Sequence, residues 1–233
     1  MNKFWNWIKN ETERVLRIDG IIAENSWFDD EISPKQFRDE LNSGDGDITV
    51  WINSYGGDCV AAAQIYNMLK DYAHKVTVKI DGIAASAASV ICMAGDTVKI
   101  SPVGALMIHD PLTAVVGNSE ELKTAIRVLG EIKETIINAY EAKTKLPRDK
   151  ISKMMTAETW MNANKALDLG FVDEILYTDE KGVNSSHTLA DLSDAVIFSR
   201  MSITNCLLNK IKSKASSKKD AAEFKHRIAL IKP

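Results

Sequence analysis

The sequence has few cysteines, and it lacks any long uninterrupted apolar stretch. Its 233 residues include three cysteines, which stand far apart without the short spacing of a metal-binding motif. No apolar run approaches the roughly 20 residues that a membrane-spanning helix requires. The first nine residues carry aromatic side chains, but they have neither an unbroken apolar core nor a small-residue cleavage site, so they do not match a secretory signal. These absences predict a cytoplasmic protein, with Cys59 and Cys92 as buried thiols in apolar helical contexts.

The charges are placed unevenly along the chain. The net charge is −3, yet the residues from Lys181 onward carry ten Lys or Arg against four Asp or Glu. We therefore expect an N-terminal segment over residues 1–13, a main domain over residues 14–178, and a basic extension over residues 179–233 that is partly disordered or forms short amphipathic helices. The extension lacks interleaved aromatic residues, so we expect no nucleic-acid role for it.

Strand patterns and helix patterns alternate through the main domain. Period-2 apolar alternation and turn signals predict strands over residues 14–22, 48–53, 75–80, 97–100 and 171–176. Caps and helical spacing predict helices over residues 34–41, 59–71, 118–144, 148–155 and 163–169. Strands that alternate with helices indicate an α/β domain with largely parallel pairing.

The stretch from Lys75 to Gly95 holds the first candidate catalytic residue. Its strand pattern leads into a run of small residues that suits a closely packed helix, closed by Gly95. Ser86 therefore stands where a strand gives way to a helix and where backbone N–H groups have no partner within the helix. A hydroxyl there is open to a substrate carbonyl, and the Ala87 N–H is available to the oxyanion formed on attack. The alternative is that small residues at such a junction serve packing alone.

Two further motifs follow apolar strands in the same way. They are Asn53-Ser54-Tyr55-Gly56-Gly57-Asp58 and Met107-Ile108-His109-Asp110-Pro111. Together with the Ser86 stretch and a later Gly-Phe-Val-Asp segment, they resemble in order and spacing the Clp peptidase family, self-compartmentalising serine proteases of the crotonase-like superfold. The resemblance covers about residues 16–176. It implies an α/β fold of repeated β-β-α units with a protruding handle helix.

The resemblance assigns catalytic roles to individual residues. It implies that Ser86 is the nucleophile, that His109 is the general base, and that the N–H groups of Gly57 and Ala87 form the oxyanion hole. The residue types suit this chemistry, because a histidine with a pKa of about 6.5 can take the serine proton near neutral pH and later give it to the leaving amine. Taken without the other motifs, His109 would more often be a structural histidine.

The third member of the triad departs from the family pattern. The family's acid is usually aspartate, whereas the matching position here is Glu158, and a glutamate can orient an imidazole as an aspartate does. Asp168 and Asp173 are weaker candidates, since they lie in helix and turn contexts. The other histidines, His74, His187 and His226, are expected to be bystanders.

The resemblance also implies a substrate site and an assembly. The substrate-binding candidates are Gly56, Asp58, Leu112, Thr113 and Ala114, with residues 112–117 as a segment that pairs with a peptide strand. The helix over residues 120–144 would be the handle between rings, so we expect a homo-oligomeric ring, a heptamer or a double ring. We expect no metal and no cofactor.

Two features suggest a branch within this family. The aromatic start over residues 3–8 and the Glu-Thr-Trp at the acid position resemble the branch of tailed phages and prophages, which trims capsid or scaffold proteins during head maturation. We therefore expect a prohead maturation serine endopeptidase that acts without ATP, in the host cytoplasm or inside the procapsid. The alternatives are an ATP-dependent Clp peptidase subunit that works with an unfoldase, a crotonase-like acyl-CoA enzyme, and a non-catalytic ring subunit. No strand is followed by G-x-G-x-x-G, which argues against a dinucleotide-binding protein.

Overall fold

The computed structural model describes residues 3–9, 13–23 and 34–178 of the chain. All of them belong to the first of two units, Met1–Gly182 and Val183–Pro233. The extension predicted for residues 179–233 therefore lies outside the described residues, as do His187, His226 and Cys206. In the described part of the chain, no helix combines the length and apolarity that crossing a membrane requires.

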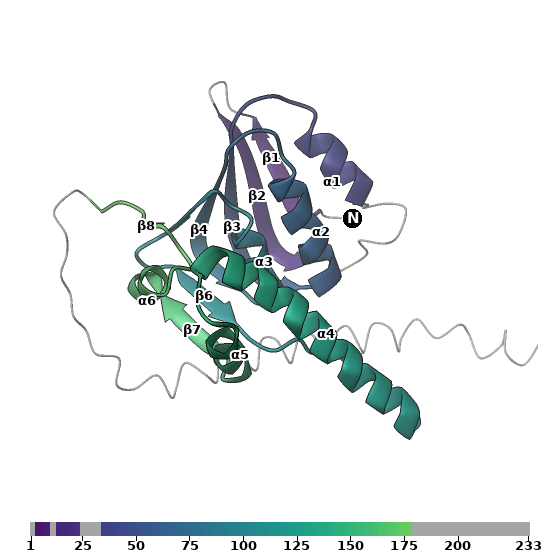
Figure 1. The fold of residues 1–233 in the computed structure, drawn as a ribbon. Helices are drawn as coiled ribbons and strands as arrows, with labels where there is room; N and C mark the ends of the chain where they lie inside the picture. The colour runs from purple at the N-terminus through teal and green to yellow at the C-terminus, as the bar shows by residue number, and fades with distance from the viewer. Residues whose placement is uncertain (1–2, 10–12, 24–33, 179–233) are drawn as a thin grey trace, which may run out of the picture. The chain divides into compact units, whose positions relative to one another are not determined.

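An eight-stranded sheet forms the centre of the described unit (Figure 1). Its strands follow the order β1-β2-β3-β4-β5-β8, and β6 pairs with both β4 and β7. The bounds are β1 Trp5–Lys9, β2 Arg14–Ile22, β3 Ile48–Gly57, β4 Val76–Ala85, β5 Thr97–Ile100, β6 Ala105–Ile108, β7 Thr159–Asn162 and β8 Glu174–Ile175. All pairings are parallel except β1 with β2 and β6 with β7. The predicted α/β class is confirmed.

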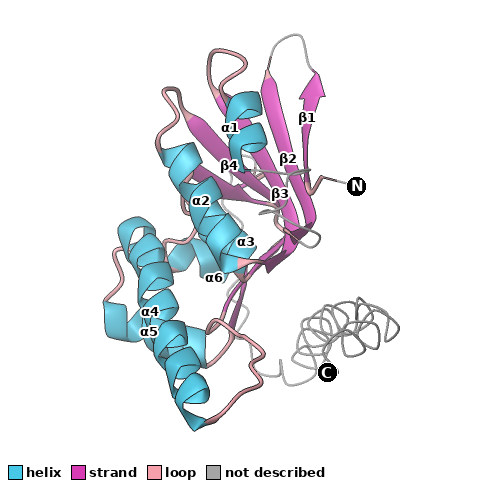
Figure 2. Ribbon diagram, turned by 90° about the vertical axis from the view of Figure 1, so that its right-hand side faces the viewer, coloured by secondary structure: helices cyan, strands magenta, loops and turns pink. Residues whose placement is uncertain are grey.

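Figure 2 shows α1 and α2 along one face of the strands β1 to β4, while α4 and α5 lie beyond the lower end of these strands. Helix α3 contacts β3 and β4. The helices are α1 Pro34–Leu41, α2 Cys59–Lys70, α3 Ala87–Cys92, α4 Ser119–Thr144, α5 Arg148–Thr156 and α6 Ala163–Asp168. The period-2 pattern explains the burial of β4, because Val76, Val78 and Ile80 are buried while the two residues between them are half-buried. The buried stripe of each parallel strand packs beneath the helices and forms the core.

The longest helix, α4, is packed at one end only. It begins with a capping box, in which the Asn118 side chain accepts from the N–H groups of Glu120 and Glu121, and the Glu121 carboxylate accepts from the Asn118 N–H. Residues buried near its carboxyl end are Ile137, Ala139 and Tyr140, whereas Leu122, Ile126 and Val128 are exposed. Figure 1 shows α4 running beyond the strands, as the resemblance to a handle implied.

The N-terminal strand β1 was not predicted. It pairs antiparallel with β2, in a register that sets Trp5 opposite Ile18. The Trp5 ring is buried against Phe37 of α1, and its indole N–H donates to Glu40 over 2.8 Å. The segment over residues 1–13, which the sequence set apart, therefore contributes an edge strand and a core side chain to the sheet.

Several further elements differ from the prediction. Strands β3 and β4 were expected to end at residues 53 and 80, but pairing with their neighbours carries them on to Gly57 and Ala85. The strand predicted over residues 171–176 is only Glu174–Ile175, and Phe171 is instead a buried core residue with its ring edge-on to Tyr140. Strand β7 was not predicted, because its four residues gain strand structure only from pairing with β6. Helix α3 ends at Cys92 rather than at Gly95. Whether a short segment forms a strand depends more on the strand it pairs with than on the intrinsic β-propensity of its residues.

Candidate active site

Ser86 lies at the junction between β4 and α3, as the sequence predicted. It is the N-cap of α3, and its backbone has φ 56° and ψ −127°, a region that a residue with a Cβ adopts rarely. The Ser86 N–H donates to the Met107 carbonyl over 2.9 Å, which ties this strained turn to β6. Strain held in place by the surrounding strands is typical of a site where a reacting group must be positioned.

The pairing of β4 with β6 brings the two main catalytic candidates together. These strands are parallel, and Ala85 is in register with Met107. Both strands therefore end at the same edge of the sheet, with Ser86 following one and His109 following the other. The carboxyl ends of neighbouring parallel strands are the usual place for a site in an α/β fold.

The two side chains form a direct hydrogen bond. The Ser86 Oγ lies 2.7 Å from the His109 Nε2. Burial lowers the pKa of His109, against the opposing effects of the Glu158 and Asp110 charges and of a hydrogen bond to the Asp110 backbone. A lowered pKa keeps the imidazole neutral at pH 7, so His109 can act as the base that takes the serine proton.

The antiparallel pairing of β6 with β7 places the third candidate. Ile108 is in register with Thr159. Because the strands are antiparallel, continuing this register brings the residue after Ile108, His109, opposite the residue before Thr159, Glu158. The Glu158 charge acts on His109, and the Trp160 indole N–H donates to the Glu158 carboxylate over 3.3 Å. Glu158 itself has a positive φ of 49°. Glu158 thus lies next to the strand that pairs with β6, and its charge acts on the imidazole.

The weaker acid candidates either make other contacts or are exposed in the structure. The Asp173 carboxylate accepts from the Val98 N–H over 2.7 Å and from the Lys143 ammonium over 2.6 Å. Asp168 is exposed at the end of α6. Neither acts on the charge of His109 in this structure, which favours Glu158.

The two glycines that end β3 fit tightly around the nucleophile. Gly56 has φ 96°, and a Cβ on it would lie 2.7 Å from both the Ala85 carbonyl oxygen and the Ser86 Cβ. Gly57 has φ 151°, and a Cβ there would lie 2.2 Å from the Ile22 carbonyl oxygen. Both positions therefore exclude a side chain, and the β3 backbone can approach the reacting serine closely.

The other predicted substrate-binding residues divide into two kinds. The Asp58 carboxylate caps α2, accepting from the N–H groups of Val60 and Ala61 over 2.9 and 2.8 Å. Leu112, Thr113 and Ala114 are exposed and irregular, between β6 and α4. Asp58 therefore stabilises the start of α2, whether or not it also contacts substrate. Residues 112–114 follow the catalytic histidine closely in the chain and have a backbone without regular structure.

A hydrogen-bonded chain behind Ser86 was missed at the sequence level. The Ser89 hydroxyl donates to the Ser86 carbonyl over 2.6 Å and lies 2.7 Å from the Tyr140 hydroxyl. Because the Ser89 proton is committed to the carbonyl, Tyr140 must be the donor to Ser89. Helix α4 therefore supports the turn that carries the nucleophile, through a contact between residues 51 positions apart that no local pattern reveals.

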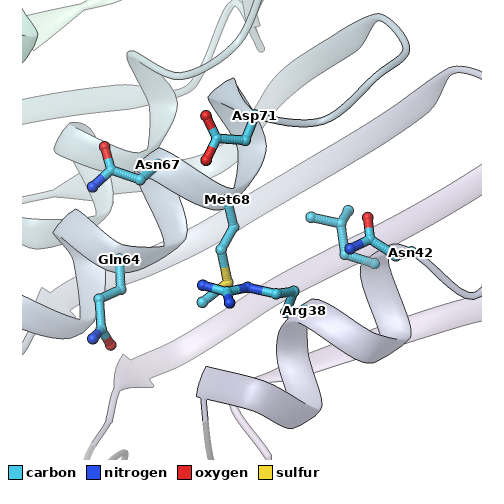
Figure 3. A pocket seen from close by; sticks show the side chains of 7 residues that line it. Arg38, Asn42, Gln64, Asn67, Met68 and Asp71 are labelled. Atoms are coloured by element: carbon cyan, nitrogen blue, oxygen red, sulfur yellow. The ribbon is translucent and has the colours of Figure 1, made fainter.

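A pocket of about 410 Å³ lies elsewhere, between α1 and α2 (Figure 3). Its lining is mostly polar and comprises Arg38, Leu41, Asn42, Gln64, Asn67, Met68 and Asp71. None of the predicted catalytic or substrate-binding residues lines it. The hydrogen-bonded Ser86 and His109 carry chemistry that this cavity lacks, so they define the candidate active site.

The described residues contain no group of three or more His, Cys, Asp and Glu side chains arranged to hold a metal ion. His74, expected to be a bystander, pairs with Asp45 instead of entering the site. Of the two described cysteines, Cys92 is fully buried as predicted and Cys59 is half-buried. Burial raises the pKa of both thiols, which keeps them protonated near neutral pH.

Comparison with known proteins adds independent findings to this geometry. The family model described as Clp protease matches residues 13–179. The chain is 31% identical over 176 residues to the ATP-dependent Clp protease proteolytic subunit 1 of Chlamydia pneumoniae, which covers 70% of this chain and 92% of that protein. It is 34% identical over 140 residues to the ATP-dependent Clp protease proteolytic subunit of Porphyromonas gingivalis, covering 58% and 62%. A solved structure of a ClpP1 mutant from Listeria monocytogenes superposes with a TM-score of 0.60 at 26% identity, covering 70% of this chain and 90% of that one.

Proposed function

The chain belongs to the Clp protease family, and is by family a serine-type peptidase; from this premise we propose that it cleaves peptide bonds with Ser86 as nucleophile and His109 as general base. The observation that carries the proposal is the 2.7 Å contact between the Ser86 Oγ and the His109 Nε2 at a strained strand-to-helix turn. A serine is a weak nucleophile until a neighbouring base takes its proton, and this contact supplies that base.

The proposed reaction has two halves. The Ser86 Oγ attacks the peptide carbonyl while His109 takes its proton, and the N–H groups of Gly57 and Ala87 stabilise the oxyanion. His109 then gives the proton to the leaving amine, which departs and leaves an acyl-enzyme. Water, deprotonated by His109, attacks the acyl group and releases the second product. Glu158 holds the imidazole in orientation and stabilises its charged form.

We propose that the substrate lies as an extended peptide beside residues 112–114. These residues are exposed and without regular pairing, so their backbone groups can pair with a peptide strand. Gly56 would let the scissile bond approach Ser86 closely, since its place admits no side chain. Asp58 would act indirectly, by fixing the start of α2 next to Gly57.

We propose further that the protein is the proteolytic subunit of an ATP-dependent protease, rather than a prohead maturation protease. The relatives from Chlamydia pneumoniae and Porphyromonas gingivalis are both named as proteolytic subunits of an ATP-dependent Clp protease. The aromatic start, which suggested a phage branch, has a structural explanation, because Trp5 is a buried core residue of the sheet. Cleavage of capsid or scaffold proteins remains the second candidate, favoured by the Glu-Thr-Trp sequence at the acid position.

A ring assembly and a cytoplasmic location belong to the same proposal. The outer half of α4 exposes Leu122, Ile126 and Val128, a cost in water that contact with another subunit would remove. A closed ring of identical subunits, a heptamer or a double ring, would enclose the active sites and admit only unfolded chains.

A crotonase-like acyl-CoA enzyme and a non-catalytic ring subunit are less well supported. The first would use the oxyanion site without a serine–histidine pair, and the second would need neither residue. Of these three activities, only nucleophilic catalysis by a serine requires the hydrogen bond between Ser86 and His109.

The test compares the wild-type full chain with Ser86→Ala. We expect the wild type to react with a fluorophosphonate at Ser86 and to hydrolyse a fluorogenic peptide, and the variant to do neither. Degradation of casein is then measured with and without an ATP-driven unfoldase, and cleavage of a capsid scaffold is measured without nucleotide. Hydrolysis that persists in Ser86→Ala would refute the assigned nucleophile, and nucleotide-free scaffold cleavage would favour the prohead function.

A further inference from the structure

A triangle of polar contacts adjoins the catalytic histidine. The Lys133 ammonium lies 2.8 Å from the Asp110 Oδ1 and donates to the Thr156 Oγ1 over 2.9 Å. The Thr156 hydroxyl lies 3.1 Å from the Asp110 Oδ2 and 3.0 Å from the Ser152 carbonyl, and can donate to either. We call Asp110, Lys133 and Thr156 the Asp110 triangle. None of them was a site candidate in the sequence.

The Asp110 triangle joins three elements that meet at the active site. Asp110 follows His109 directly, Thr156 ends α5 two residues before Glu158, and Lys133 lies in the middle of α4. The residues that flank the base and its orienting acid are therefore held to one another and to the same lysine. A displacement of Lys133 would release both segments together.

The pair at the centre of the triangle is partly withdrawn from water. The side chains of Lys133 and Asp110 are 19% and 38% exposed, against 71% and 76% for the pair that Lys123 and Glu120 form on the outer half of α4. The Asp110 Oδ1 itself is buried. A charge pair with less solvent around it is less screened, so removal of either partner leaves a charge whose field reaches its neighbours.

We propose that Asp110, Lys133 and Thr156 are positioning residues for catalysis, which hold His109 and Glu158 in register and balance the charge beside the imidazole. This proposal rests on the peptidase function proposed above. It gives Lys133 of α4 an indirect role in that function, since Lys133 is proposed to act through Asp110 and to touch neither the substrate nor the reacting atoms.

The charges around His109 predict the direction in which its pKa should shift in each variant. The charged groups that act on His109 are Glu158, just before β7, and Asp110, after β6, and both raise its pKa against the larger effect of burial. From α4, the Lys133 cation neutralises Asp110. Loss of the Asp110 charge should lower the pKa of His109, whereas loss of the Lys133 charge should raise it. An ion pair too far from the imidazole, or too well screened by water, would move neither pKa.

The experiment follows the rate constant for modification of Ser86 by a fluorophosphonate, in the full chain, as a function of pH. We expect Asp110→Asn to shift the acidic limb of this profile to lower pH and Lys133→Met to shift it to higher pH. Each rate constant is divided by the plateau value of the same protein. At a pH on the acidic limb, this ratio should be about threefold higher than wild type for Asp110→Asn and about threefold lower for Lys133→Met. The double variant should lie close to wild type, because both charges are gone.

Controls separate positioning from folding and assembly. Lys123→Met makes the same chemical change on the same helix away from Asp110 and should leave the profile unchanged, and Lys133→Arg keeps the charge and should retain the wild-type midpoint. Thermal unfolding and sedimentation are measured for every variant. If Lys133→Met does not fold, the isosteric Asp110→Asn carries the test.

Two failures are distinguishable. If Asp110→Asn leaves the midpoint at its wild-type pH while Ser86→Ala abolishes modification, the positioning proposal is wrong and the peptidase function stands. If Ser86→Ala is modified as fast as the wild type, the peptidase function itself is wrong. Shifts of both single variants in the same direction would also overturn the proposal.

Discussion

Two regions of the described unit could receive a ligand, and they differ in their backbone. At the carboxyl ends of β3 and β4, Gly56 and Ser86 hold positive φ angles and nearly touch. The other region is the pocket of about 410 Å³ between α1 and α2, and none of the residues that line it has a positive φ. The comparison teaches that a reacting side chain is held in place by strained and closely packed strand ends. A cavity between two regular helices forms with ordinary backbone angles and holds no such side chain.

After the loss of Ser86 itself, the largest expected effect at the strand ends comes from the proposed orienting acid. Glu158→Gln should lower kcat for a fluorogenic peptide by about 10³-fold, because the amide cannot stabilise the imidazolium that forms when His109 takes the serine proton. Glu158→Asp keeps the carboxylate and should lose far less. Steady-state kinetics with thermal unfolding check the result, and equal losses in both variants would mean that the charge at position 158 is not used.

A smaller effect is expected from the glycine that contacts the nucleophile. Gly56→Ala should lower kcat/KM by about 10²-fold, since its Cβ would meet the Ser86 Cβ at 2.7 Å and displace the turn. Gly46→Ala is the matched control, because Gly46 also has a positive φ, 91°, but a Cβ there meets nothing within 4 Å. The control should lose about 1 kcal/mol of stability and keep its activity. Comparable loss of activity in both would show that strain, and not contact with Ser86, is what matters.

The pH dependence of the wild type tests the environment of the base. Since burial lowers the pKa of His109, the acidic limb of kcat/KM should have its midpoint below about pH 6.5, the ordinary value for histidine. At pH 6.5 the enzyme should thus keep more than about half of its plateau rate. A midpoint above that value would mean that the carboxylates outweigh burial in the working enzyme.

The smallest effect is expected in the pocket. Arg38→Ala should change kcat/KM for a small peptide by less than about twofold and stability by less than about 0.5 kcal/mol, because Arg38 is exposed on α1 and lines no part of the catalytic site. The same kinetic and unfolding measurements apply. A loss comparable to that of Gly56→Ala would erase the distinction between the two regions.

Much of the fold could be predicted because its signals are local. The alternation in β4 and the Asn118 capping box depend on residues a few positions apart, and both lie where the sequence placed them. Strand β1 could not be found in this way, since its five residues become a strand only beside β2. The comparisons do not show the phage branch, and one of the aromatic residues that suggested it, Trp5, is a core residue of this strand.

The sequence by itself determined that Ser86 stands at a strand-to-helix turn, because the period of apolar residues and the small residues after it act over short distances along the chain. Only the tertiary structure decided what faces that turn. Parallel pairing of β4 with β6 brings His109 to Ser86, antiparallel pairing of β6 with β7 sets Glu158 opposite His109, and α4 delivers Lys133 to Asp110. Register between strands is a property of their shared hydrogen bonds and buried faces, so it exists only once distant segments have met.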